Sequence, residues 1–314
     1  MFQSKSRMNK FIARIWKPFI SFCILAYIWN TIAIEDLQKV INQIRLEPLL
    51  LALAVFMIAQ IIAAQRFVYV MRTLKRRVSL NLSIRVHFIG LWFNQVLPTS
   101  LGGDMVKVMV LRKRLGISRA IRGALLDRIS GFMILMLSTL VLLPFYHSVV
   151  GEDSLTITAG VLSTGFFIGL IIAIYFSGKS QIRKRLPRSF HYVFLLLQDI
   201  RRFRKWRPFY RQLWTSIVVH LNGIAAYALI GKALGVNLSL SIYVLLVPLV
   251  FLVALIPISF AGWGIRETGA IGLFSIVGVT AEEAFAMSLV FGLLLIVAGL
   301  PGGVLWFFKQ KTNH

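Results

Sequence analysis

The sequence predicts an all-α polytopic membrane protein with about six transmembrane helices and two re-entrant, broken-helix hairpins arranged as inverted repeats. Three observations predict this class. Of the 314 residues, 58% are hydrophobic and only 15% are charged, which is more apolar surface than a soluble domain of this length uses. Several apolar runs approach the roughly 20 residues that cross a bilayer. The basic residues lie between these runs, which is the positive-inside pattern.

The net charge of +24 would suggest a nucleic-acid partner if the cations formed a stripe on a soluble face. They flank apolar runs instead, so we interpret them as topology signals and expect no nucleic acid. The single cysteine, Cys23, lies in the first apolar run, which excludes a disulfide framework. No spacing of His, Cys or acids is typical of a metal site. We therefore expect no metal, no cofactor and no catalytic residue.

The apolar runs define six crossings. A basic N-terminus places the start of the chain in the cytoplasm, and the first run has no small-residue cleavage site after it, so we expect a retained helix. The first span, 18–34, then leads outward to Glu35, Asp36 and Glu47. An even number of crossings returns the C-terminus to the cytoplasm. The expected spans are 18–34, 49–70, 120–145, 154–177, 212–233 and 282–308.

This topology separates the charges. All but four of the 35 Lys and Arg fall on the cytoplasmic side, and the four exceptions are Lys39, Arg45, Lys232 and Arg266. We predict a single transmembrane domain, 1–314, whose halves, 1–178 and 212–314, are joined by a basic cytoplasmic loop, 179–211. An amphipathic helix near 191–202 is expected to lie on anionic headgroups. The expected location is the inner, or plasma, membrane.

Two apolar segments, 86–110 and 242–277, are broken by proline and glycine before they are long enough to span. The first has basic residues on both flanks, so we expect a hairpin that enters from the cytoplasm and returns; two shortened spans fit the charges less well. The second is expected to enter from the outside. Both hairpins are predicted to turn near their prolines, Pro98 and Pro257.

The two broken segments share a pattern of proline, serine, two glycines and an acid. The matching residues are Pro98, Ser100, Gly102, Gly103 and Asp104 in the first, and Pro257, Ser259, Gly262, Gly264 and Glu267 in the second. Broken helices at matching positions in two halves indicate the central site of a transporter. Each returning half-helix would direct its positive dipole end at an anion. The alternative is that proline and glycine only kink spanning helices.

Four charges in or near the lipid core are candidate site residues: Asp104, Arg128, Arg266 and Glu267. Such charges usually pair or line a polar path. Asp104 could also be an N-cap of the following half-helix, and Asp127 with Arg128 could be a surface salt bridge. Arg266 is expected to be functional or a structural partner of Asp104.

The motifs resemble the flippase-like transmembrane region of lysylphosphatidylglycerol synthases and the stand-alone proteins related to it. The pieces that carry the resemblance are Asn94-x-x-x-Pro98-x-x-x-Gly102-Gly103-Asp104, Asp127-Arg128, Pro257-x-x-x-x-Gly262-x-Gly264-x-Arg266-Glu267 and Leu300-Pro301-Gly302. Relatives often carry Arg where this chain has Lys107, which keeps the charge but loses bidentate phosphate geometry. We expect a stand-alone member without the aminoacyl-transfer domain.

The resemblance implies lipid translocation. The hypothesis is a flippase for an anionic phospholipid or a polyprenyl-phosphate-linked lipid, in which Lys107, Arg128 and Arg266 contact phosphate while Asp104 and Glu267 balance charge or couple protons. The substrate-binding set also includes Asn94 and the proline, serine and glycine residues of the two motifs. One alternative is a non-catalytic partner in envelope-lipid or glycolipid synthesis, with self-association or an envelope-lipid enzyme as its contact. Another is a membrane glycosyl or acyl transferase.

Overall fold

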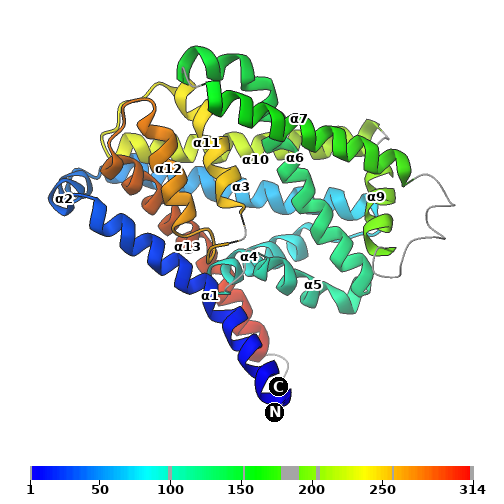
Figure 1. The fold of residues 1–314 in the computed structure, drawn as a ribbon. Coiled ribbons are helices and arrows are strands. Elements are labelled where there is room, and N and C mark those ends of the chain that lie inside the picture. The colour runs from blue at the N-terminus through cyan, green and yellow to red at the C-terminus, as the bar shows by residue number, and fades with distance from the viewer. Residues whose placement is uncertain are drawn as a thin grey trace. The chain divides into compact units, whose positions relative to one another are not determined.

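The computed structural model describes residues 2–97, 101–150, 153–177, 191–202, 206–256 and 258–311. Within these ranges the fold is entirely helical, with twelve α-helices and no strand (Figure 1). The helices are α1 (Phe2–Thr31), α2 (Ile34–Asn42), α3 (Leu46–Thr73), α4 (Leu80–Val96), α5 (Gly102–Leu115), α6 (Ile117–Val150), α7 (Asp153–Phe176), α9 (His191–Arg202), α10 (Trp206–Ala233), α11 (Leu240–Ala254), α12 (Ile265–Ser275) and α13 (Ala281–Lys311).

Five helices, α3, α6, α7, α10 and α13, are long and apolar enough to cross a bilayer. A sixth candidate is α1 together with α2, which is bent away from it by 93°. Each predicted span coincides with one of these helices. The first ends at Thr31 rather than Ile34, because Ala33 is extended and the acidic, amphipathic α2 starts a new direction. The prediction of a polytopic all-α membrane protein is confirmed.

The described chain packs as two compact units built from interleaved segments. Unit 1 contains residues 1–58, 85–107 and 222–314, and unit 2 contains residues 59–84 and 108–221. Four of the described helices, α3, α4, α5 and α10, continue from one unit into the other. Each unit therefore joins elements far apart in sequence, so each has its own core and its own polar clusters.

An aromatic cluster forms the core of unit 1. Phe291 of α13 lies 5.4 Å from both Tyr227 of α10 and Phe251 of α11, measured between ring centroids, and 5.7 Å from Phe56 of α3. Tyr227 also stacks on Phe274 of α12 at 5.8 Å. Offset and edge-to-face aromatic pairs stabilise a core beyond the area they bury. This cluster fixes α11 and α12 against α13.

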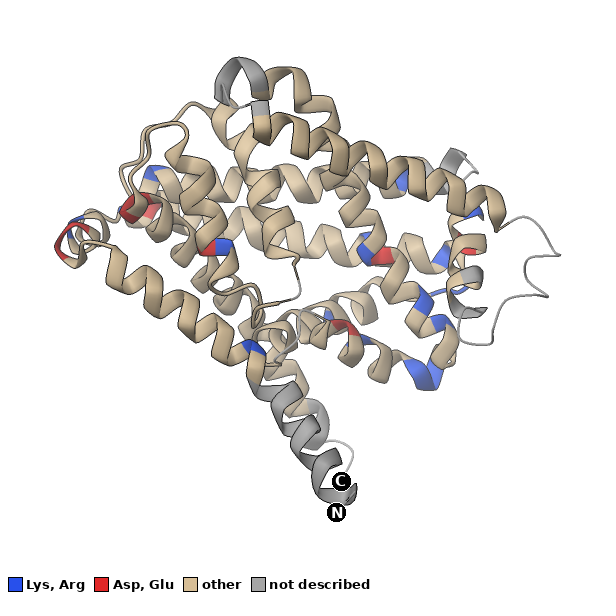
Figure 2. Cartoon of the chain, viewed as in Figure 1, with Lys and Arg blue, Asp and Glu red and all other residues tan. Residues whose placement is uncertain are grey.

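One end of unit 1 gathers the links that were predicted to be outside. The amide of Ala33, which precedes α2, donates to Glu282 at the start of α13 at 3.4 Å. The amide of Arg45 donates to the carbonyl of Ala233, at the end of α10, at 2.9 Å. Figure 2 shows the acids of α2 and of the start of α13 near one another. The α1–α2 corner, the end of α10 and the start of α13 thus share one side, as the charge pattern predicts.

The segment predicted as the first hairpin turns back on itself. Gly103 at the start of α5 is hydrogen-bonded to Asn94 near the end of α4. One turn further along α5, the side chain of Lys107 lies against Gly90, one turn earlier in α4. Later residues of α5 therefore contact earlier residues of α4, so the two helices are antiparallel. The turn itself, including Pro98 and Ser100, lies outside the described residues.

The second segment also turns back. Val253 of α11 packs on Gly269 of α12, and the carbonyl of Ala254 lies next to Gly262 in the link between the two helices. The helices are short, with α11 ending at Ala254 and α12 ending at Ser275, so neither has the length of a spanning helix. Pro257 falls outside the described residues, and the chain around it reverses direction.

Both hairpins pack on α13, from opposite ends. In the first, Phe88 lies against Gly302 and Trp92 against Gly299, so α4 runs antiparallel to α13 and ends level with about residue 295. In the second, Arg266 at the start of α12 lies against Gly292, and α12 then runs back toward the start of α13, which follows it after the short link 276–280. The two tips therefore approach the middle of α13 from opposite sides, as an inverted pair requires.

Unit 2 is built around α6, with α7 and α9 packed on it. Phe132 of α6 and Phe166 of α7 meet edge to face with centroids 4.9 Å apart. The predicted amphipathic helix is confirmed as α9, and its Asp199 is held by Arg122 of α6 at 2.5 Å. Only 11% of the apolar stretch of α7 is buried within the protein. Its exposed isoleucines and Val161 are part of the surface that a bilayer would cover.

Candidate functional site

The tip of the first hairpin depends on two glycines and one asparagine. The amide of Gly103 donates to Oδ1 of Asn94 at 2.8 Å, which satisfies one unpaired donor in the first turn of α5. A Cβ on Gly103 would collide with the carbonyl of Gly90 and with Asn94, and one on Gly102 would collide with Leu97. Only glycine therefore lets the two half-helices touch, and Asn94 acts as a cap supplied across the hairpin.

In the first hairpin, an ion pair joins two residues that lie one helical turn apart on α5. Nζ of Lys107 lies 3.5 Å from Oδ1 of Asp104, and both side chains are largely shielded. The Lys107 stem packs on Gly90, where a Cβ would meet Cε at 2.7 Å. Asp104 also stands in the first turn of α5, where a carboxylate is stabilised by the helix dipole. Asp104 is therefore the third residue of α5 and not its N-cap, and it has a cation partner.

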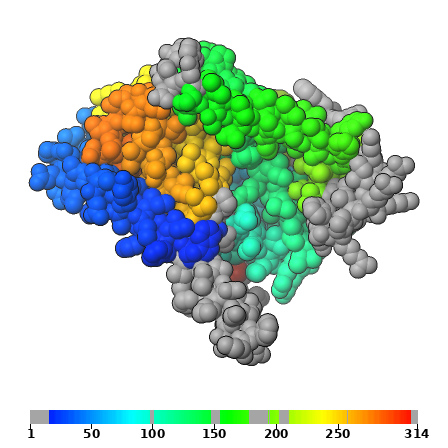
Figure 3. All heavy atoms as spheres, in the orientation of Figure 1, coloured from blue at the N-terminus to red at the C-terminus, as the bar shows by residue number. Residues whose placement is uncertain are grey.

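The tip of the second hairpin is a non-helical segment whose backbone groups are satisfied from α1. Ser21 donates its hydroxyl hydrogen to the carbonyl of Trp263 at 3.0 Å and accepts the amide hydrogen of Phe260 at 2.7 Å. Gly262 and Gly264 have φ values of 86° and 85°, the left-handed region that favours glycine. Figure 3 shows α1 beside α12 in unit 1. Irregular backbone at membrane depth needs such internal partners.

Arg266 and Glu267 form a buried charge cluster at the start of α12. Nη2 of Arg266 lies 2.5 Å from Oε1 of Glu267, with side-chain exposures of 3% and 0%. Ser288 of α13 accepts from Nε of Arg266 and donates to Oε1 of Glu267, both at 3.1 Å. The other carboxylate oxygen accepts the Gly264 amide hydrogen at 2.6 Å. The Trp263 ring completes the cluster, with its centroid 4.9 Å from the guanidinium carbon.

Gly292 makes room for this cluster. A Cβ at Gly292 would collide with the Arg266 guanidinium and with the Trp263 ring. The guanidinium therefore lies directly against the backbone of α13, where it contacts the Glu267 carboxylate, the Ser288 hydroxyl and the Trp263 ring. A buried pair is stable only when its remaining donors and acceptors are satisfied in this way.

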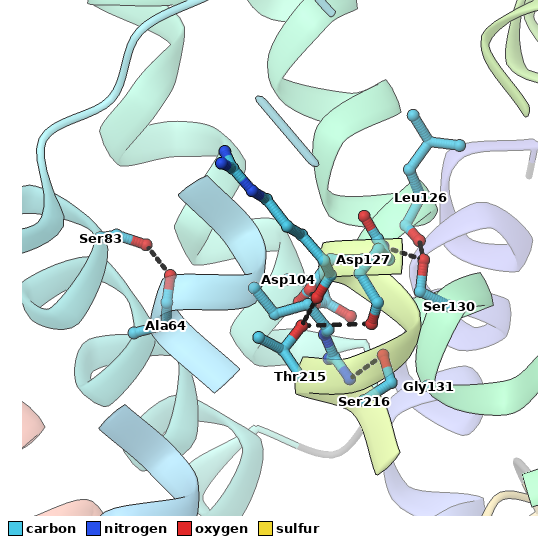
Figure 4. Close-up of polar contacts among 12 residues, drawn as sticks. Ala64, Ser83, Asp104, Leu126, Asp127, Ser130, Gly131, Thr215 and Ser216 are labelled. Atoms are coloured by element: carbon cyan, nitrogen blue, oxygen red, sulfur yellow. Dashed lines mark hydrogen bonds and ion pairs between the residues drawn. The ribbon is translucent and has the colours of Figure 1, made fainter. Parts of the chain in front are cut away.

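A second buried ion pair lies in unit 2. Nε of Arg66, on α3, donates to Oδ1 of Asp127, on α6, at 2.8 Å, and its Nη1 lies 3.5 Å from Oγ of Ser216, on α10. His220, also on α10, bonds the carbonyl of Gly131 at 3.0 Å. Figure 4 shows Asp127, Gly131 and Ser216 gathered where α6 meets α10. Asp127 is therefore a buried partner rather than half of a surface salt bridge.

The predicted site residues fall into separate groups. Asn94, Gly103, Asp104 and Lys107 come together in the first hairpin, and Gly264, Arg266 and Glu267 in the second. Ser259 is buried beside them at the second tip. Arg128 is half-buried on α6, in unit 2. Each intramembrane cation of the hairpins has a carboxylate partner in its own hairpin, and the proposed proximity of Asp104 and Arg266 stays a prediction.

Sequence reasoning missed several members of these clusters: Arg66, Ser216, Trp263 and Ser288. Arg66 is a cation inside the predicted span 49–70, and a charge within a span is itself a signal of a buried partner. Ser288 gave no such signal, because one serine in a long apolar helix is common. Its role depends on α13 packing against α12.

These features define a polytopic, all-helical membrane protein with two opposed half-helix hairpins and buried ion pairs. The sequence matches the family described as lysylphosphatidylglycerol synthase TM region over residues 14–303. Since the match covers most of the chain, the protein belongs to this family. No curated protein and no solved structure matches the chain. The family motif Leu300-Pro301-Gly302 lies where α13 meets α4, because Gly302 contacts the backbone of Phe88.

Proposed function

We propose that the protein translocates a phosphate-bearing lipid, either an anionic phospholipid or a polyprenyl-phosphate-linked lipid, between the leaflets of the inner, or plasma, membrane. The observation that carries the proposal is the pair of hairpins whose tips approach the middle of α13 from opposite ends. Broken helices of this kind are used to hold a substrate near the bilayer midplane. The family name also connects the chain with a phosphate-bearing lipid.

The charges of the hairpins suit exchange between carboxylate and phosphate. Lys107 is paired with Asp104, and Arg266 with Glu267. A substrate phosphate would compete with these carboxylates for the same cations, since both anions accept charge-assisted hydrogen bonds. Protonation of Glu267 would weaken its hold on Arg266, which offers a route for proton coupling. In this proposal Asp104 and Glu267 occupy the two cations until a substrate phosphate replaces them.

The topology of the proposed transporter follows from the charges. Both termini and the basic loop 179–211 are placed in the cytoplasm by the positive-inside pattern. The first hairpin then opens from the cytoplasmic leaflet and the second from the outer leaflet. A lipid headgroup could reach either tip from its own side, which is the requirement for alternating access.

Reconstitution into liposomes tests the proposal. The reporters are phosphatidylglycerol, phosphatidylcholine and a polyprenyl phosphate, each with a fluorescent label that a membrane-impermeant reductant bleaches from the outer leaflet. We expect that the protein makes the inner-leaflet label of an anionic reporter accessible to the reductant. The measurement is made with and without an imposed pH gradient. Protein-free liposomes are the control. No translocation of any reporter, by folded protein under either condition, would rule the proposal out.

A further inference from the structure

Unit 2 contains a cavity of about 620 Å³ that is separate from the hairpin residues and lies among α6, α7, α9 and α10. Its wall is mainly apolar, with Ile129 and Met133 contributed by α6 and Ile171 and Ile174 by α7. The volume is within the range of small-molecule sites, about 300–1,000 Å³. A mostly apolar cavity of this size favours an apolar occupant over water, because water would find few polar partners there.

The cavity is accessible from the bilayer. Ile171 and Tyr175, which line it, are 66% and 63% exposed at the surface of the protein. They belong to α7, the helix with the least buried apolar surface among the candidate spans. A lipid chain could therefore enter sideways between α7 and the rest of unit 2. An aqueous solute would have to cross the same apolar surface.

The rest of the wall comes from α10 and from the amphipathic helix α9, which places that end of the cavity at the level of the headgroups. Asp199 of α9 is 1% exposed and is bound by Arg122 of α6 at 2.5 Å, so this helix is fixed to the bundle. Its Ile200 lines the cavity beside Arg201. Arg201 is exposed, which leaves its guanidinium accessible to a phosphate at the membrane surface.

We propose that this cavity binds one acyl chain of an anionic phospholipid, with the lipid phosphate at Arg201. The apolar wall favours a lipid acyl chain, and the Arg201 cation at the end of the cavity favours an anionic headgroup. The inference rests on binding alone. It holds whether or not the hairpins of unit 1 transport lipid, so the two proposals can fail separately.

Photocrosslinking tests the site in full-length protein in nanodiscs. The probe is phosphatidylglycerol with a diazirine in the middle of one acyl chain, and labelled peptides are identified by mass spectrometry. We expect preferential labelling of the stretches 129–134 and 171–175. Ile174→Trp should fill the cavity and strongly reduce labelling of 129–134. The matched control is Ile172→Trp, on the exposed face of α7 and outside the cavity, which should leave that labelling unchanged.

A charge variant tests the headgroup contact and does not depend on core packing. Arg201→Gln should reduce labelling by phosphatidylglycerol about fivefold, as expected for one cation near a membrane surface. It should not affect labelling by diacylglycerol that carries the same diazirine chain. Arg119→Gln, at an exposed cation outside the cavity, is the control. Labelling spread evenly over the lipid-facing helices, or equal labelling of wild type and Ile174→Trp, would overturn the proposal.

Discussion

Glu267 is fully buried, and three groups compensate its carboxylate. Arg266 supplies the counter-charge, while Ser288 and the Gly264 amide supply hydrogen bonds. The exact positions of these donors matter because an uncompensated buried charge is costly. The same cluster closes the N-terminus of α12, so the ion pair stabilises the helix end and the tertiary contact with α13 together.

Replacing Arg266 with alanine should strongly destabilise the protein. The substitution leaves Glu267 without a cation, and removal of one partner of a buried pair costs about 3–5 kcal/mol. The carboxylate seen paired with Arg266 is Glu267, while Asp104 is paired with Lys107. We expect reduced membrane yield and a lower thermal midpoint in detergent, measured by fluorescence size-exclusion chromatography.

The double variant Arg266→Gln with Glu267→Gln is the control for charge. It removes both charges and keeps side chains able to hydrogen-bond with Ser288, so the yield should approach that of the wild type. If Arg266→Ala alone matched the wild type in yield and midpoint, the cluster would not stabilise the fold.

Single residues with charge were predictable, and their partners were not. Asp104, Arg266 and Glu267 stand out because they interrupt apolar sequence. Arg66 and Asp127 are separated by 61 positions, so no local pattern connects them. Ser288 is likewise identified only by the packing of α13 on α12. Sequence therefore finds most of these ionisable groups, although not Arg66, and tertiary structure assigns their pairs.

At the scale of elements, the hairpins follow from local chemistry. Proline and glycine break the two short apolar segments, and flanking charges require each to return to its starting side. The structure confirms paired half-helices at both places. The sequence pattern does not predict the surface on which the two hairpins pack. The close approach of α4 to Gly299 and Gly302, together with that of Arg266 to Gly292, shows that both hairpins pack on α13.

Gly302→Ala should separate α4 from α13. A Cβ at this position would collide with the backbone of Phe88, which cannot rotate away as a side chain could. Overpacking of this kind costs about 1–3 kcal/mol, so we expect a lower thermal midpoint. Gly272→Ala, a helical position with open space around it, is the matched control and should be neutral or stabilising, by up to about 1 kcal/mol. Equal midpoints for the two variants would contradict the close contact.

At the scale of the whole molecule, charge decides orientation. The shared side of α2, the end of α10 and the start of α13 agrees with the predicted grouping, and the charge pattern assigns that side to the outside. Single cysteines introduced in a Cys23→Ala background test the assignment with an impermeant thiol reagent. Lys232 should be labelled from outside and Arg76 should not.

Three further labelling positions lie outside the described residues: Glu152, Arg185 and the C-terminal His314. Glu152 is expected outside, and Arg185 and the C-terminus inside. Labelling of position 185 in intact cells would refute this orientation, and with it the assignment of each hairpin to a leaflet.

The central claim is that the buried charges of the hairpins handle the lipid and do not only support the fold. The most direct test is the rate at which the folded double variant, Arg266→Gln with Glu267→Gln, translocates labelled phosphatidylglycerol in liposomes, normalised to the amount of reconstituted protein. The account predicts a rate at least about tenfold below wild type, equivalent to ~1.4 kcal/mol, because the phosphate-binding cation is missing. A wild-type rate would show that these residues are scaffold and that the site lies elsewhere.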